Sequence, residues 1–189
     1  MRHLYLLALL PPKELSEEIH EIRLECAQKF GVQKALRPPV HITLYRPFHA
    51  EQAFEDELIR LLDQGTRGIP SFTQELENFG TFKSQVVFIK ALKSPELIRL
   101  HEAIVSVIRK NHLDKQQDQQ KDQPFHPHIT IAYRDIPMDL FPAIWGEYKD
   151  RKMKFRFEAK QFSLLKHENS IWNLIKDFQL TDVDEKRNK

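Results

Sequence analysis

The chain has 189 residues, 41% of them hydrophobic and 30% charged, a composition typical of a soluble globular protein with a core of its own. Its 29 basic and 27 acidic side chains nearly cancel. This balance excludes a global electrostatic field that would attract polyanions, so any affinity for phosphate has to come from a local site.

The first predicted elements are a buried strand and an amphipathic helix. The apolar run from Leu4 to Leu10 is short, lacks a small-residue cleavage site and ends at Pro11, so it is typical of a core strand rather than of a signal peptide. Apolar residues then recur at helical spacing from Ile19 to Phe30, and Gly31 is predicted to end this helix.

The only cysteine of the chain, Cys26, lies within that helical pattern. A single cysteine cannot form an internal disulfide, which indicates a reducing and therefore cytoplasmic location. Burial as a small apolar residue is favoured over a nucleophilic role, because no pattern typical of a cysteine nucleophile surrounds it. No segment approaches the roughly 20 apolar residues that span a bilayer, so we expect no membrane partner.

The middle of the chain continues with strands and helices. Residues 40–45 alternate with the period of a strand, and an apolar stripe at helical spacing runs from Glu51 to Leu62. Two segments rich in β-branched and aromatic residues, Phe72–Phe82 and Gln85–Ala91, predict a hairpin. A further helix with one apolar face extends from Leu97 to about Asn111.

A polar, low-complexity tract at residues 113–124 interrupts this pattern. Because such a composition supplies little that can pack, a flexible solvated connector is favoured over a lid beside the following strand. The last residues, 182–189, are predicted to form a frayed tail.

The last third of the chain is predicted to be mainly strands. A strand at Phe125–Tyr133 is followed by a short helix at Asp139–Tyr148, and residues 161–180 form a closing hairpin. Between them, residues 152–157 alternate basic and apolar side chains. A half-buried strand with a solvated face is favoured there over a nucleic-acid-binding stripe.

Together these elements predict an α+β or α/β sandwich in one domain that spans residues 1–189. Each half contains a helix that is followed, across a loop, by a His-Ile-Thr strand. This arrangement indicates a duplicated, pseudo-symmetric lobe.

The two copies of His-Ile-Thr carry the chemistry. Residues two apart on a strand project from one face, so His41 points with Thr43, and His128 with Thr130. Two imidazoles at one phosphodiester suit general acid–base cleavage, because one can remove a proton while the other supplies one. The two threonine hydroxyls can donate hydrogen bonds to the phosphate oxygens, and no metal is required.

Two alternative interpretations compete with this one. A lone histidine on a strand is more often a satisfied structural group than a catalyst, but two copies in the same strand context argue against coincidence. A zinc site could draw three imidazoles from His41, His126 and His128. However, no acidic or cysteine ligand stands at metal-like spacing, and threonine is a poor zinc ligand, so we expect no metal and no other cofactor.

The paired motifs resemble the 2H phosphoesterase superfamily and, within it, the 2'-5' RNA ligase and RNA 2',3'-cyclic phosphodiesterase group. The resemblance covers most of the chain: the two motifs lie about ninety residues apart, a strand opens the chain, and Asn78–Phe82 resembles the mid-chain turn of the group. It implies an α+β fold, a bilobal pseudo-symmetric sandwich of two antiparallel sheets that line a central cleft, with helices on the outside.

The resemblance also implies which residues form the site: catalytic His41 and His128, and phosphate-binding Thr43 and Thr130. Family members often carry an arginine three residues after the second threonine, where this chain has Tyr133. Strand phase favours the next residue, Arg134, as the third phosphate contact. The same phase puts Arg46, which follows the first motif, on the face opposite to His41 and Thr43 unless the strand bulges.

Three aromatic residues are candidates for stacking on the base of a substrate. Strand phase adds Tyr45 to the face of the first motif, and Phe48 and Phe82 are the other two candidates.

The predicted function is hydrolysis of a 2',3'-cyclic or 2'-5'-linked phosphodiester at an RNA end or on a nucleotide, with reversible 2'-5' RNA ligation as a further activity of the same site. The alternatives are a cyclic phosphodiesterase for small metabolites and a non-catalytic nucleotide- or RNA-binding module on the same fold. We expect a monomer that requires no protein partner.

Overall fold

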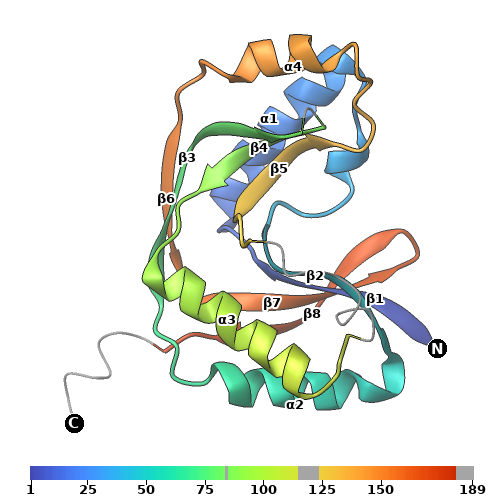
Figure 1. Ribbon diagram of the computed structural model, residues 1–189, viewed down its shortest axis with the longest axis vertical. Helices are drawn as coiled ribbons and strands as arrows, with labels where there is room; N and C mark the ends of the chain where they lie inside the picture. The colour runs from blue at the N-terminus through green and yellow to red at the C-terminus, as the bar shows by residue number, and fades with distance from the viewer. Residues whose placement is uncertain (84, 115–123, 182–189) are drawn as a thin grey trace.

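The computed structural model of the protein describes residues 1–83, 85–114 and 124–181 (Figure 1). This part of the chain contains two four-stranded sheets and four α-helices. In chain order the elements are β1 (Arg2–Leu9), α1 (Lys13–Phe30), η1 (Lys34–Leu36), β2 (Ile42–Glu51), η2 (Gln52–Phe54), α2 (Glu55–Thr66), β3 (Phe72–Phe82), β4 (Val86–Ala91), α3 (Pro95–Lys110), β5 (His128–Tyr133), α4 (Phe141–Tyr148), β6 (Lys154–Ala159), β7 (Gln161–Glu168) and β8 (Ile171–Gln179).

Each sheet carries one His-Ile-Thr strand at its edge. The first sheet has the strand order β2-β1-β7-β8 and the second has the order β5-β4-β3-β6, and neighbouring strands in both are antiparallel. The two motif strands, β2 and β5, are the edges at which the sheets approach each other (Figure 1). The predicted α+β sandwich of two antiparallel sheets is therefore confirmed, and its topology brings the two motifs together.

The helices lie on the outside of the two sheets. Helices α2 and α3 pack on each other and on the first sheet, whereas α1 packs against β5 of the second sheet (Figure 1). Helix α1 precedes the first motif in sequence yet contacts the strand of the second motif, and α3 precedes the second motif yet contacts β2. The two halves of the chain are thus interlocked around their motif strands.

Strand β1 lies inside the first sheet and is buried on both faces. Tyr5, Leu7 and Leu9 join the main hydrophobic core, while Leu6 and Ala8 belong to a smaller cluster on the opposite face. Burial of apolar side chains is the main favourable term in folding, so a strand buried on both faces anchors its sheet. The prediction of a core strand at this position is confirmed.

Helix α1 begins after Pro12 and ends where the sequence predicts. Gly31 follows its last residue in the left-handed region, with φ of 72°, and donates its backbone N–H to the carbonyl of Ala27 at 2.8 Å. Glycine adopts this conformation without the steric cost of a Cβ. Cys26 on the same helix is buried, and burial raises the pKa of its thiol, as expected for a structural cysteine.

Several boundaries differ from the prediction. Strand β2 continues to Glu51, so the helix predicted from that residue begins only after the turn η2. Gly65 lies inside α2, where a Cβ would come within 2.1 Å of Val107 Cγ2. The glycine is therefore needed for the close approach of α2 and α3. The strand predicted from Phe125 begins at His128.

Of two further predictions, the half-buried strand is confirmed, and the polar connector falls mostly outside the described residues. In β6, Lys154 and Arg156 are exposed and Phe157 is buried, which confirms a half-buried strand. Most of the connector predicted at residues 113–124 lies outside the described residues, as does the predicted tail at 182–189, but Asp114 is described and is only 4% exposed. No helix in the described ranges is long and apolar enough to cross a membrane.

Candidate active site

The two motifs occupy matching positions on the facing strands. His41 immediately precedes β2, and His128 is the first residue of β5. Thr43 and Thr130 are half-buried, whereas the residues on either side of them are buried in the main core: Ile42, Leu44, Ile129 and Ile131. Each motif strand therefore has an apolar back and a polar front, as the alternation predicts.

The two imidazoles are held by the same type of hydrogen bond. Nδ1 of His41 lies 2.7 Å from the carbonyl oxygen of Pro39, and Nδ1 of His128 lies 2.6 Å from that of His126. Because a carbonyl oxygen can only accept, Nδ1 carries the proton in both rings and donates it. The Nε2 atom of each ring is then left to take up or release a proton.

Both imidazoles are biased toward the neutral form. The pKa of His41 is lowered to about 4, chiefly by burial and further by the charges of Arg23 and His128, while the bond to Pro39 acts in the opposite direction. Burial also lowers the pKa of His128, opposed by its bond to the His126 carbonyl. His128 lowers the pKa of His41 because two cationic imidazoles repel each other. This effect indicates that the two rings lie close enough to share one site.

Both motif strands bulge just after their threonine. Along β2, Thr43 pairs with Ala8 but Tyr45 pairs with Leu7, so β2 has one residue more than β1. Strand β5 shows the same irregularity against β4, between Thr130 and Ala132. A bulge of this kind reverses the side-chain alternation beyond it, so the strand phase used in the sequence prediction fails after each threonine.

In the first motif, the bulge exchanges the predicted places of Tyr45 and Arg46. Tyr45 is buried in the main core, at 7% exposure, and its hydroxyl donates to a carboxylate oxygen of Asp114 at 3.1 Å. The side chain of Arg46 is 33% exposed and forms an ion pair with Asp114 at 2.6 Å. The prediction that Tyr45 shares the face of His41 is wrong, and Arg46 takes that face instead.

Phe48 does not offer a surface to a substrate. It is 1% exposed and packs edge-on against Tyr45, with ring centroids 5.5 Å apart. A second register shift between β1 and β2 turns it into the core. The sequence-based choice of Phe48 for base stacking is therefore corrected.

In the second motif, the bulge reverses the preference between Tyr133 and Arg134. Tyr133 is half-buried at the end of β5, three residues beyond Thr130 and past the bulge, which places it on the threonine side. Arg134 lies beyond the strand, exposed and with φ of 66°, and its guanidinium sits over the Tyr133 ring at 5.2 Å. The phase argument for Arg134 is wrong, and its contact with phosphate stays a prediction.

Phe82 lies beside the second motif. Its ring centroid is 5.0 Å from that of His128 in an edge-on arrangement, and it stacks on Phe88 at 4.3 Å. Phe82 is half-buried, so part of its ring remains available to a ligand. Of the three aromatic candidates, it is the one with both an exposed surface and a contact to a motif histidine.

The structure adds two residues that the sequence interpretation missed. Arg23 of α1 donates to the carbonyl oxygen of Thr130, and Nδ1 of His101 on α3 lies 2.8 Å from the carbonyl oxygen of Leu44. The sequence contains a signal for the first of them, because an arginine between Ile22 and Cys26 interrupts the apolar face of its helix. Nothing in the pattern around His101 distinguishes it.

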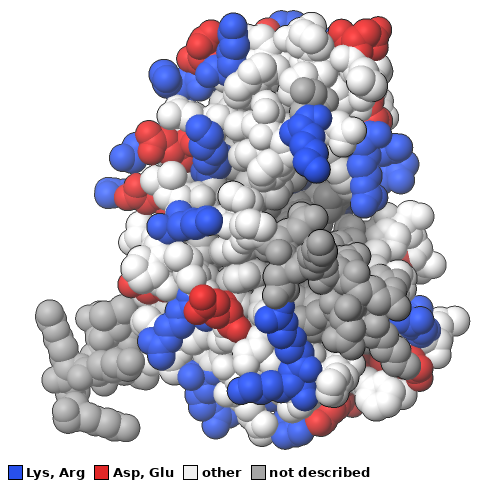
Figure 2. Space-filling model, in the orientation of Figure 1, with Lys and Arg blue, Asp and Glu red and all other residues white. Residues whose placement is uncertain are grey.

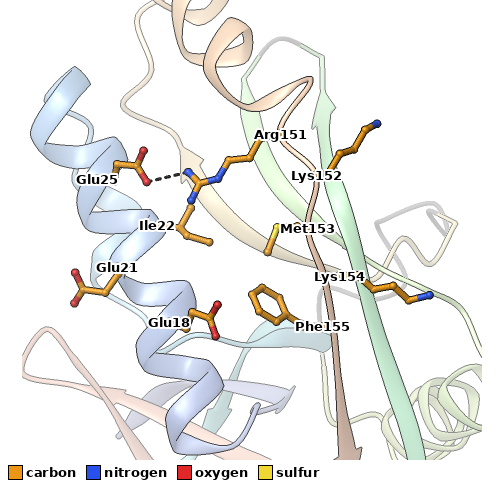
Figure 3. A pocket seen from close by; sticks show the side chains of 9 residues that line it. All are labelled: Glu18, Glu21, Ile22, Glu25, Arg151, Lys152, Met153, Lys154 and Phe155. Carbon is orange, nitrogen blue, oxygen red and sulfur yellow. Dashed lines mark hydrogen bonds and ion pairs between the residues drawn. The ribbon is translucent and has the colours of Figure 1, made fainter.

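A pocket elsewhere on the molecule contains neither motif. It lies between α1, which carries the carboxylates, and the chain around the start of β6, from which Arg151, Met153 and Phe155 face the helix (Figure 3). Glu25 and Arg151 already pair across it at 2.9 Å. Among the residues that the structure describes, no group of three histidine, cysteine or acidic side chains is placed to hold a metal ion.

Comparison with known proteins assigns the family. Residues 11–171 match the model of the 2'-5' RNA ligase superfamily. The chain therefore belongs to this superfamily of 2H phosphoesterases.

Relatives and solved structures agree with this assignment. A protein of Geobacillus sp. strain WCH70 that carries the provisional name of phosphoesterase is 28% identical over 177 residues, or 92% of this chain and 94% of the relative. The crystal structure of Escherichia coli LigT complexed with 3'-AMP has a TM-score of 0.67 at 21% identity, covering 96% of this chain and 99% of that chain. TT0787 of Thermus thermophilus has a TM-score of 0.69 at 20% identity, with coverage of 97% and 100%. The two structures share the fold of this chain.

Proposed function

We propose that this protein hydrolyses 2',3'-cyclic phosphates of RNA ends or nucleotides to 2'-phosphomonoesters by two-histidine acid–base catalysis. The observation that carries the proposal is the matched anchoring of His41 and His128, each with Nδ1 bonded to a carbonyl and Nε2 left for proton transfer. Cyclic phosphodiester cleavage needs one proton removed and one supplied, which two such imidazoles can do.

In the proposed reaction, the Nε2 atom of one histidine accepts a proton from water as the water oxygen bonds to phosphorus. The bond from phosphorus to the 3' oxygen breaks, and the other histidine protonates that oxygen from its Nε2. Each transfer is typically worth about 10²- to 10⁴-fold in rate. The hydroxyls of Thr43 and Thr130 donate to the non-bridging oxygens, where negative charge develops in the transition state. The same steps with the 5'-hydroxyl of a second ribose in place of water form a 2'-5' linkage, and the reverse of those steps cleaves it.

Two neighbouring side chains support a nucleotide substrate. Arg46 lies on the Thr43 side of β2 and can pair with a phosphate, although Asp114 now holds its guanidinium. Phe82 lies against His128 and offers a partly exposed ring for base stacking. E. coli LigT has been crystallised with 3'-AMP, ATP and NADP+, which supports nucleotide binding by this fold.

The charge distribution favours a short substrate over a long RNA. Basic and acidic side chains are interspersed over the visible face, without a single basic field (Figure 2). Recognition of a long nucleic acid usually relies on such a field. A small cyclic nucleotide or a related metabolite is therefore the second candidate substrate, cleaved by the same chemistry.

The test is a comparison of a 2',3'-cyclic mononucleotide with an oligonucleotide that ends in the same group, with excess chelator present. We expect turnover of both in chelator, with 2'-phosphate as the product, and similar kcat/KM values if only the terminal nucleotide is recognised. Loss of activity in chelator would contradict the two-histidine mechanism. Binding of the cyclic nucleotide with no turnover from about pH 4 to pH 9 would favour a non-catalytic binding module.

A further inference from the structure

Arg23 is a buried cation in the interface between α1 and β5. Its side chain is 1% exposed, on the helix face that also buries Ile19, Ile22 and Cys26. Removing a guanidinium from water is costly unless hydrogen bonds replace its hydration. The contacts of the Arg23 guanidinium must therefore compensate for the lost hydration.

Its guanidinium connects the two motifs. Nε donates to the carbonyl oxygen of Thr130 at 2.9 Å, and Nη1 donates to that of Pro38 at 3.1 Å. Thr130 belongs to the second motif. Pro38 directly precedes Pro39, whose own carbonyl orients the ring of His41. One planar group thus fixes the backbone that aims the first imidazole relative to the strand that carries the second.

The charge of Arg23 is not neutralised by its described surroundings. Nη2 is buried and finds no hydrogen-bond acceptor among the described residues, and no described carboxylate forms an ion pair with this side chain. Burial lowers the pKa of Arg23 to about 10, with Tyr133 acting in the opposite direction, so the group remains protonated at neutral pH. Its field therefore acts on whatever titrates nearby, and His41 is such a group.

The pseudo-symmetric counterpart of this contact has no permanent charge. Helix α3 places His101 on the carbonyl of Leu44, at the bulge of β2, much as α1 places Arg23 on the carbonyl of Thr130, at the bulge of β5. His101 uses Nδ1 for this bond and stacks on Phe125 at 3.8 Å, and burial lowers its pKa. The acceptors differ by one position, because Leu44 follows Thr43, the counterpart of Thr130. A cation thus lies at one bulge and a neutral ring at the other.

We propose that Arg23 is a positioning residue that sets the spacing of the two motifs and makes their histidines inequivalent, with His41 acting as the base and His128 as the acid. The proposal rests on the proposed function. Among the described residues, the charged or titratable groups that act on His41 are Arg23 of α1 and His128 of β5, and the one that acts on His128 is His126. A fixed positive charge favours the neutral, proton-accepting form of His41 over the cation.

Two substitutions separate the charge from the geometry. Arg23→Met removes the charge and the hydrogen bonds, whereas Arg23→Lys keeps the charge on a single ammonium that lacks the planar fork spanning both carbonyls. Arg151→Met is the matched control, because Arg151 also bonds to α1, through an exposed pair with Glu25, but contacts neither motif. We would measure kcat and KM for a 2',3'-cyclic nucleotide across pH, and the titration of both imidazoles by NMR.

For Arg23→Met we expect kcat to fall about 10- to 100-fold with little change in KM, because misplaced catalytic groups lose rate rather than affinity. The acidic limb of the pH profile and the titration of His41 should both move to higher pH, since a neighbouring positive charge has been removed. Arg23→Lys should lower kcat but leave the His41 titration near its wild-type position. Arg151→Met should change neither.

Two results would overturn the proposal. One is an Arg23→Met variant in which the His41 titration does not move. The other is an Arg23→Lys variant with full kcat, and this second test remains available if Arg23→Met does not fold. The NMR titration needs no turnover. If the wild-type protein does not cleave the cyclic nucleotide, the proposed function fails, while the effect of Arg23 on His41 is still measured.

Discussion

Strands β2 and β5 carry the same tripeptide, the same Nδ1 anchor and the same bulge, yet their surroundings differ. Beyond the bulge, β2 presents Arg46 paired with Asp114, whereas β5 presents Tyr133. His128 is flanked by the rings of Phe82 and Phe88. The two histidines proposed for acid–base catalysis are thus anchored symmetrically, while the side chains proposed for substrate recognition are distributed unequally between the two lobes.

The largest effect should come from removing either imidazole. We expect His41→Asn and His128→Asn each to lower kcat about 10²- to 10⁴-fold, because each removes one proton transfer. His49→Asn is the matched control, since His49 is an exposed histidine on the same strand β2. Steady-state assays on a 2',3'-cyclic nucleotide measure all three. A single essential histidine, with the other dispensable, would contradict a mechanism in which each imidazole carries out one proton transfer.

The next effect should come from the threonines. Thr43→Val and Thr130→Val keep the shape of the side chain but remove the hydroxyl, and loss of one donor to a developing oxyanion costs about 10²- to 10³-fold in kcat. The double variant, assayed in the same way, tests whether the hydroxyls act on one phosphate. Unchanged kcat in both single variants would show that the threonines only pack.

A smaller effect should separate the two arginines that follow the motifs. Arg46→Met should raise KM for the cyclic nucleotide about tenfold, the scale of a lost charge-assisted hydrogen bond. Arg134→Met should raise KM by less, because Arg134 is exposed beyond the end of β5 and its guanidinium lies over the Tyr133 ring. A larger rise in KM for Arg134→Met than for Arg46→Met would contradict the placement of Arg46 beside Thr43 by the bulge in β2.

The smallest effect concerns stability against pH. The pKa of His41 is about 4 in the folded protein and about 6.5 in the unfolded chain, so unfolding takes up a proton between these values. The contribution of His41 to stability is complete above about pH 6.5 and is lost as the pH falls toward 4. Denaturant unfolding of His41→Asn over this range should show a shallower pH dependence than the wild type. An unchanged slope would mean that His41 is not buried as described.

The sequence predicts the motif residues and most elements for a physical reason. Period-two alternation around Ile42 and Ile129 is decisive wherever a strand is regular and backed by a core. It fails beyond the threonines, because a bulge depends on pairing with β1 or β4, which lies far away in the chain. The prediction therefore placed Tyr45 on the wrong side, and the strand phase from which Arg134 was chosen does not extend past Thr130.

Other features depend on tertiary contacts that no local pattern encodes. Arg23 appears in the sequence only as a charge within an apolar helix face, and its acceptors lie on residues 15 and 107 positions away. Gly65 is required inside α2 because Val107 of α3 leaves no room for a Cβ there. Such contacts come from the interlocking of the two halves, whereas the sequence indicated only a duplicated, pseudo-symmetric lobe.

The most direct test of the central claim is the structure of the protein with a nucleoside 2'-phosphate bound. We predict phosphorus between the Nε2 atoms of His41 and His128, with hydrogen bonds from Thr43 and Thr130 to its non-bridging oxygens. A phosphate that contacts only one motif, or that lies in the pocket between α1 and β6, would contradict the claim that the two strands form one active site.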